Sequence, residues 1–164
     1  MARDIYRFLD ENQIAYERYD HPPVFTCEEA ERLVPPLPAV PTKNLFLRDR
    51  TGGRHFLVAV GYQKGVDLKA LSAMLGARKL SLASRERLDR LLGVEPGCVT
   101  LLGIVNDEGR GVEVIIDQDL WRADALACHP LVNTSTLVIS RQDIERMLRI
   151  TRHAFRILNV PERS

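Results

Sequence analysis

The chain has 164 residues, of which 45% are apolar and 27% are charged. Both fractions are typical of globular proteins and argue against a disordered, collagen-like or coiled-coil chain. The length is that of one ordinary domain. Lys and Arg number 23 against 22 Asp and Glu, whereas proteins that coat nucleic acid through bulk charge carry a large positive excess. Any nucleic-acid partner must therefore be bound locally.

No segment approaches the roughly 20 consecutive apolar residues that a membrane span needs, and the charged N-terminus has no apolar signal-peptide core. The three cysteines, Cys27, Cys98 and Cys128, form no C-x-x-C pair. This usage favours reduced thiols over a disulfide framework and argues against a structural zinc site. We expect a cytoplasmic protein with one domain over residues 1–164, no membrane association and no metal site.

Apolar residues at helical spacing, in several places after an N-cap residue, predict helices. These helices cover, in chain order, residues 4–12, 27–33, 67–75, 84–92 and 140–151. Alternating or continuous β-prone runs predict strands. These strands cover residues 14–19, 44–48, 55–60, 79–82, 98–105, 112–116 and 136–139.

Glycine-bearing turns at residues 49–53 and 106–109 predict two hairpins. Four prolines within residues 35–41 exclude regular structure there. Strands joined mostly by hairpins, with helices between them, predict an α+β fold in which a mixed, largely antiparallel sheet is surrounded by helices.

Lys43 and Asn44 stand where the proline-rich loop enters a predicted strand. An ammonium group in such a place can reach into a cleft and bind a phosphate or a developing oxyanion. A solvated lysine at a strand end is the plainer interpretation, and the local pattern alone favours it.

His129 is followed by Pro130, which restrains the backbone beside the imidazole, and the polar Asn133 comes soon after. A neutral histidine can orient a water molecule or an ester carbonyl. A partly buried histidine that closes a strand end is the alternative. Cys128 is adjacent, but neighbouring residues of a strand point to opposite faces, so a Cys–His nucleophile is not expected.

Gly97 follows Pro96 in a turn that leads to Thr100. A glycine here can let a ligand approach the backbone closely, or it can simply make the turn. Arginine clusters on the helices over residues 84–92 and 140–151 are diluted by acidic residues and are typical of solvated faces. The sequence contains no P-loop, dinucleotide fingerprint or HExxH motif.

Taken together, the ordered segments resemble the YbaK/ProX aminoacyl-tRNA editing domains, over about residues 6–158. The segments are TKNLFLRD, HFLVAV, VDLKALSAMLGARKLSLASRERL, GVEPGCVTLLGIVND, VEVIIDQDL and HPLVNTSTLVIS. The His-Pro-x-x-Asn segment at residues 129–133 is more similar to the ProX group, the freestanding prolyl-tRNA editing proteins. Thr100-Leu101 departs from the Ser-Pro of many relatives.

The resemblance implies a curved sheet with a cleft for the aminoacylated 3′ end and acceptor stem of proline tRNA. It implies metal-free hydrolysis, without a cofactor, of the ester to a wrong amino acid, with alanine expected first. Lys43, Asn44 and His129 would be the catalytic residues, and Gly97, Thr100 and Asn133 would bind the substrate. The terminal ribose hydroxyl would assist the attack, and a transient contact with prolyl-tRNA synthetase is a further expectation.

Three alternatives stay open from the sequence. The preferred acyl group can be cysteine or another small residue instead of alanine. The fold can also serve as a nucleic-acid binding module without catalysis. A hydrolase that uses the thiol of Cys98 or Cys128 is the third alternative, and only adjacency in the sequence, as of Cys128 and His129, favours it.

Overall fold

The computed structural model describes residues 4–164, apart from the side chain of Cys27. Its helices are α1 (Ile5–Glu11), α2 (Cys27–Leu33), α3 (Leu68–Leu75), α4 (Arg85–Leu92), α5 (Gln118–Trp121), α6 (Arg141–Ile150) and the 3₁₀ helix η1 (Leu101–Asn106). Its strands are β1 (Glu17–Asp20), β2 (Val40–Arg48), β3 (His55–Gly61), β4 (Ser81–Leu82), β5 (Val112–Asp117), β6 (Ala125–Cys128), β7 (Ser135–Ser140) and β8 (Phe155–Leu158).

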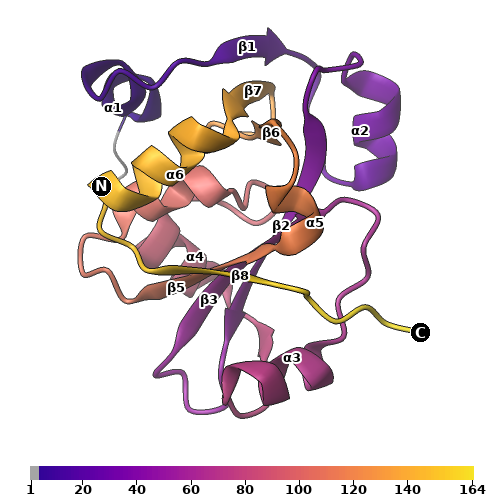
Figure 1. Cartoon of the computed structure of the whole chain (residues 1–164), viewed down its shortest axis with the longest axis vertical. Coiled ribbons are helices and arrows are strands. Elements are labelled where there is room, and N and C mark those ends of the chain that lie inside the picture. Colours follow the sequence, from indigo (N-terminus) through magenta and orange to yellow (C-terminus); the bar gives the residue numbers. More distant parts are fainter. Residues whose placement is uncertain (1–3) are drawn as a thin grey trace.

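The strands form one mixed sheet in the order β1-β7-β6-β2-β3-β5-β8, and β4 pairs with β2 beside this path. Within residues 4–164, four strand pairs are antiparallel and three are parallel. Helix α6 packs against β7, α3 lies at the opposite end of the molecule, and α2 stands beside β2 (Figure 1). The predicted α+β class with a largely antiparallel mixed sheet is confirmed.

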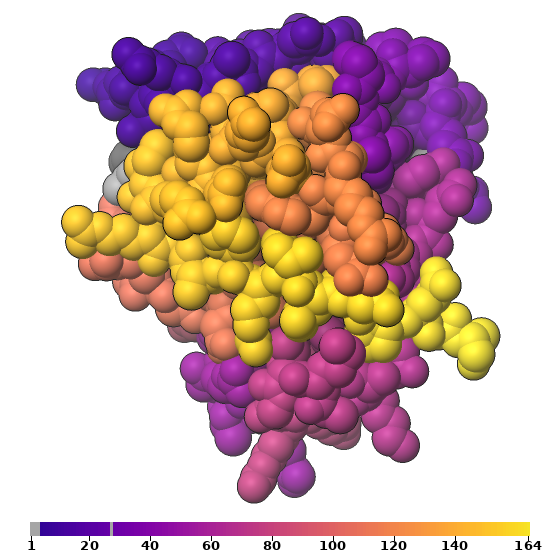
Figure 2. Space-filling view, viewed as in Figure 1, coloured from indigo at the N-terminus to yellow at the C-terminus, as the bar shows by residue number. Residues whose placement is uncertain are grey.

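Two apolar clusters cover the two faces of the central strands. Alternate residues of β3 separate them, because Leu57 and Ala59 belong to one cluster, and Phe56 and Val58 belong to the other. The larger cluster packs α1, α4, η1 and α6 against the sheet. The smaller cluster holds α3 and the segment that follows β8. Figure 2 shows the C-terminal segment (yellow) crossing the viewed face of the molecule and projecting at its edge.

The predicted starts of α1 to α4 and α6 are confirmed, because a polar side chain caps each helix. These side chains accept hydrogen bonds from backbone N–H groups of the first turn, which would otherwise have no partner. The caps are Asp4, Thr26, Asp67, Ser84 and Ser140. Glycines with positive φ end α3 and α4, at Gly76 and Gly93.

The predicted strand over residues 98–105 is wrong, and so is the hairpin that it was to form. Residues 101–106 are the 3₁₀ helix η1, and the Thr100 side chain caps it by accepting a hydrogen bond from the N–H of Leu102. Residues 101–105 are all buried, so the apolar run reflects burial on every side and not strand pairing. Strand β5 instead pairs in parallel with β3 and β8.

Strand β2 begins at Val40, inside the region where four prolines were expected to prevent regular structure. Val40 and Pro41 pair in parallel with Leu126 and Ala127 of β6, and a proline is tolerated close to the start of a strand. Strands β6 and β8 and helix α5 were not predicted. No helix in residues 4–164 is both long and apolar enough to cross a membrane.

Candidate active site

A cleft opens where β2 and β6 separate. The two strands pair only at two positions, Val40↔Leu126 and Pro41↔Ala127, and β2 then continues beside β3. The hydroxyl of Thr42 donates to the carbonyl of Ala127 at 2.6 Å and makes the last link between the strands. Beyond it, residues of β2 form one wall, the end of β6 forms another, and α2 with the proline-rich loop covers the space.

We call this space the α2 cleft. Its volume is about 670 Å³, and its wall is largely apolar. It is lined by Val24, Phe25, Thr26, Ala30, Glu31, Val34, Pro35, Pro36, Leu37, Ala39, Pro41, Thr42, Lys43, Asn44, Tyr62, Gly97, Val99, Ala127, His129 and Thr136. Four of the six predicted site residues, Lys43, Asn44, Gly97 and His129, therefore share one space, although 86 positions of the sequence separate the first from the last.

Lys43 is oriented by a chain of contacts that starts at a buried carboxylate. Its ammonium group donates a hydrogen bond to the carbonyl oxygen of Lys64. The Lys64 ammonium lies 3.1 Å from the carboxylate of Asp117, whose side chain is 2% exposed. Asp117 forms its ion pair with Lys64, and Lys43 forms no ion pair with a carboxylate of the described residues. The positive charge of Lys43 is therefore available to an anionic ligand.

Asn44 carries an unused acceptor beside the cleft. Its Oδ1 is the one buried side-chain oxygen or nitrogen atom in the described part of the chain that has no hydrogen-bond partner. A buried polar group without a partner costs free energy. Asn44 also lines the α2 cleft, so an acceptor that no described residue uses stands at its wall.

His129 follows the last residue of β6 and is held in one orientation. Its Nδ1 lies 3.2 Å from the carbonyl oxygen of Ser135, so this nitrogen donates and Nε2 is left as the acceptor. Burial disfavours the charged imidazole and lowers the pKa of His129, and the nearby His21 acts in the same direction. The neutral ring can accept a hydrogen bond from water or from a ribose hydroxyl.

Gly97 forms a close contact with Phe25. Its φ of +88° is in the region that favours glycine, and a Cβ atom at this position would lie 3.3 Å from Cδ1 of Phe25. The missing side chain therefore allows both the turn and the approach of the aromatic ring.

Thr100 and Asn133, predicted to bind substrate, do not line the α2 cleft. Thr100 is fully buried, and its hydroxyl donates to the carbonyl of His129 at 2.7 Å. The side-chain amide of Asn133 donates to the carbonyl of Val24 at 3.0 Å, and Val24 returns a backbone hydrogen bond at 3.2 Å. Thr100 thus holds His129 and Asn133 holds Val24, and both of these partners line the cleft. This geometry suits a positioning role and not contact with the substrate.

His21 and Thr136 were not predicted as site residues. Nε2 of His21 lies 2.8 Å from the hydroxyl of Thr136, and the rings of His21 and His129 meet edge to face with centroids 6.5 Å apart. One feature of the sequence could have pointed to His21: like His129, it is followed directly by proline. This second imidazole supports the wall of the cleft that holds His129.

The described thiols are poorly suited to nucleophilic catalysis. Burial raises the pKa of Cys128 to about 12, and burial also raises the pKa of Cys98. Neither side chain lines the α2 cleft. Since the thiolate is the reactive form, the geometry gives no support to a hydrolase based on Cys98 or Cys128.

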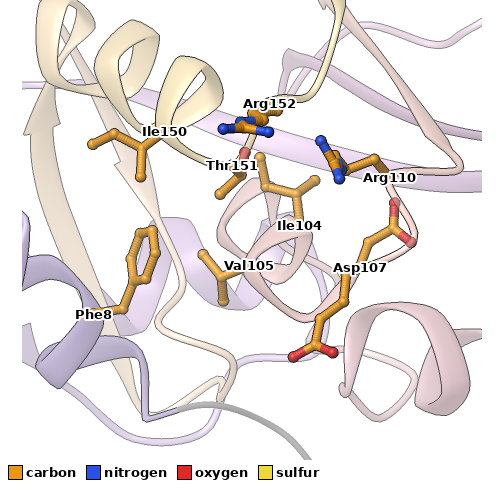
Figure 3. A pocket seen from close by; sticks show the side chains of 9 residues that line it. Phe8, Ile104, Val105, Asp107, Arg110, Ile150, Thr151 and Arg152 are labelled. Carbon is orange, nitrogen blue, oxygen red and sulfur yellow. The ribbon is translucent and has the colours of Figure 1, made fainter.

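A second cavity of about 470 Å³ lies between α1, η1 and the end of α6 (Figure 3). Arg110 and Arg152 reach toward it, and none of the predicted site residues lines it. The carboxylate of Asp107 in its wall is occupied, because it accepts hydrogen bonds from His153 at 2.9 Å and from the N–H of Val112 at 2.8 Å. The predicted chemistry therefore belongs to the α2 cleft.

Comparison with known proteins identifies the class. The aminoacyl-tRNA editing domain family matches residues 21–147. The prolyl-tRNA editing protein ProX of Acetoanaerobium sticklandii is 38% identical over 152 residues, covering 93% of each chain. The prolyl-tRNA synthetase associated domain-containing protein 1 of Danio rerio is 37% identical over 161 residues, covering 97% of this chain and 87% of its own.

Among solved structures, a crystal structure of a candidate trans-editing enzyme for prolyl tRNA synthetase superposes with a TM-score of 0.70. It covers all of this chain and 99% of its own, at 17% sequence identity, and so supports the fold. The chain belongs to the aminoacyl-tRNA editing domain family. The resemblance seen in the sequence is confirmed, and with it the enzyme class, the aminoacyl-tRNA deacylases.

Proposed function

We propose that this protein acts in the cytoplasm and hydrolyses the ester bond of mischarged proline tRNA, with alanyl-tRNA(Pro) as its preferred substrate. The observation that carries this proposal is the α2 cleft, in which Lys43, Asn44, Gly97 and His129 meet. The names of the two relatives, which refer to prolyl-tRNA editing and to prolyl-tRNA synthetase, support the choice of tRNA.

Hydrolysis of an aminoacyl ester needs few groups from the protein. An aminoacyl ester is already reactive, so the site must fix the ester, position the attacking group and stabilise the oxyanion. Lys43 supplies positive charge to the terminal phosphate or to the oxyanion. Asn44 holds the acyl group, and the neutral His129 orients water or the ribose hydroxyl. Thr100 and Asn133 position His129 and Val24 through hydrogen bonds outside the cleft.

Selectivity follows from size. A synthetase pocket that admits proline cannot strongly exclude alanine, because one to a few methylenes give only about 1–3 kcal/mol of discrimination. A second pocket that admits alanine but is too small for proline restores accuracy. In this proposal the apolar residues Val34, Pro35, Pro36 and Leu37, which line the cleft, limit the size of the acyl group.

The test is a deacylation panel with alanyl-, cysteinyl- and prolyl-tRNA(Pro). We expect rapid release of alanine, slower release of cysteine and no release of proline. Lys43→Ala should nearly abolish release, whereas Lys69→Ala, which removes an exposed lysine of α3, should leave it unchanged. Preferred release of cysteine would reassign the acyl group, and tight binding of tRNA without any release would show a binding module.

A further inference from the structure

Phe25 is a large apolar side chain that the fold leaves exposed at the α2 cleft. It is 67% exposed, more than any other large apolar side chain in the described part of the chain. A single exposed apolar residue is common and needs no explanation by itself. The position of Phe25 does need an explanation, because the residue lines the same cleft as Lys43 and His129.

The backbone on both sides of Phe25 is fixed. Val24 is buried and makes two hydrogen bonds with Asn133, one through its N–H and one through its carbonyl. Thr26 is the N-cap of α2, and its hydroxyl accepts a hydrogen bond from the N–H of Glu29 at 3.1 Å. A ligand that covers the ring therefore meets a backbone that is already ordered, which lowers the entropic cost of binding.

The ring itself is supported at one edge. Cδ1 and Cε1 of Phe25 approach the position that a Cβ atom of Gly97 would occupy, at 3.3 and 3.9 Å. The glycine lets this edge pack against the backbone, and most of the ring surface stays in water. The result is a flat, apolar and oriented surface next to the polar residues of the cleft.

We propose that Phe25 is the platform on which the terminal nucleobase of the aminoacylated RNA stacks. This inference rests on the proposed function. When the ester lies at His129 and Lys43, the ribose that carries it must lie in the cleft, and the base on that ribose must lie at the rim. Stacking on an aromatic ring needs no charge, which agrees with a protein whose formal net charge is only +1.

The test compares Phe25 variants on two forms of one substrate. Chemically aminoacylated RNA ends either in adenosine or in the same ribose without its base. Phe25→Ala should lower kcat/KM on the adenosine form by about 5-fold to 150-fold, the range that corresponds to one stacked base. It should have little effect on the abasic form. Phe25→Tyr should restore activity, and Phe25→Leu, which keeps apolar bulk without a flat ring, should not.

Leu82→Ala is the matched control, because Leu82 is 65% exposed but does not line the cleft. It should leave both substrates unaffected. Binding of uncharged RNA with and without the terminal base should show the same pattern without any hydrolysis. Equal losses on the two substrates, or no loss on either, would overturn the stacking role. Base-dependent binding without hydrolysis would retain it and would refute the proposed catalysis instead.

Discussion

The hydroxyl of Thr100 lies 2.7 Å from the carbonyl oxygen of His129 and donates to it. The hydroxyl oxygen of Thr100 also accepts a hydrogen bond from the N–H of Leu102 at 3.3 Å, so one buried hydroxyl joins the start of η1 to the residue that carries the imidazole. The position of His129 in the cleft therefore depends on a side chain that cannot touch the substrate.

Replacing Thr100 by valine keeps the shape of the side chain and removes both hydrogen bonds. The carbonyl of His129 and the N–H of Leu102 would then be buried without this partner, which costs about 1–3 kcal/mol of stability for each unsatisfied group. We expect a lower free energy of unfolding in urea and a lower kcat for deacylation. Thr100→Ser keeps the hydroxyl and should recover most of both, and a valine variant with unchanged kcat would contradict this positioning role.

This relationship also shows where prediction from the sequence reached its limit. Helix starts were predictable because capping is local, with the side chain and its N–H partner two or three residues apart, as at Asp67. The link between Thr100 and His129 spans 29 residues. It depends on η1, which was predicted as a strand because its apolar run carries no helical periodicity.

The candidate site was predictable in part for a similar reason. Local patterns singled out Lys43, Asn44, Gly97 and His129, the family resemblance gave them their expected roles, and the structure brings them to one cleft. The short parallel pairing of β2 with β6 that opens this cleft is long-range and leaves no local pattern. The role proposed for Phe25 was not predicted from the sequence, because its exposure depends on the fold and periodicity predicts only which side chains are buried.

The protonation of His129 gives a prediction on pH. Its pKa is lowered from the ordinary value of 6.5 because burial disfavours the charged ring. We expect the imidazole to stay neutral at pH 6.5, and the deacylation rate, corrected for spontaneous hydrolysis, to fall only at lower pH. Titration of the ring by NMR checks this, and a pKa at or above 6.5 would contradict it.

The same shift has a consequence for stability. Below pH 6.5 the unfolded chain binds a proton at this histidine more readily than the folded chain does. The contribution of His129 to the free energy of unfolding is therefore complete above pH 6.5 and declines as the pH falls toward the lowered pKa. His129→Gln should reduce this part of the pH dependence, which urea unfolding at a series of pH values would measure.

The buried thiol of Cys128 predicts resistance to alkylation. Cys128 has a pKa of about 12 and is 3% exposed, so iodoacetamide at pH 7 should modify it very slowly in the folded protein. The Cys98→Ser and Cys128→Ala variants should each have a deacylation rate of the same order of magnitude as the unsubstituted protein. Loss of the small buried sulfur at Cys128 should show mainly as reduced thermal stability. Complete loss of turnover in either variant, with the fold intact, would support a thiol mechanism instead.

Gly97→Ala tests the backbone of the cleft. At a φ of +88° an alanine is strained by roughly 1 kcal/mol or more, and its Cβ would meet the ring of Phe25 at 3.3 Å. Stability should fall, and deacylation should fall further because the ring is displaced from the rim. Gly111→Ala is the control, since Gly111 lacks a positive φ and a Cβ there would have no neighbour within 4 Å. Equal losses in the two variants, measured by thermal unfolding and by kcat/KM, would mean that the contact between Gly97 and Phe25 has no special part in the site.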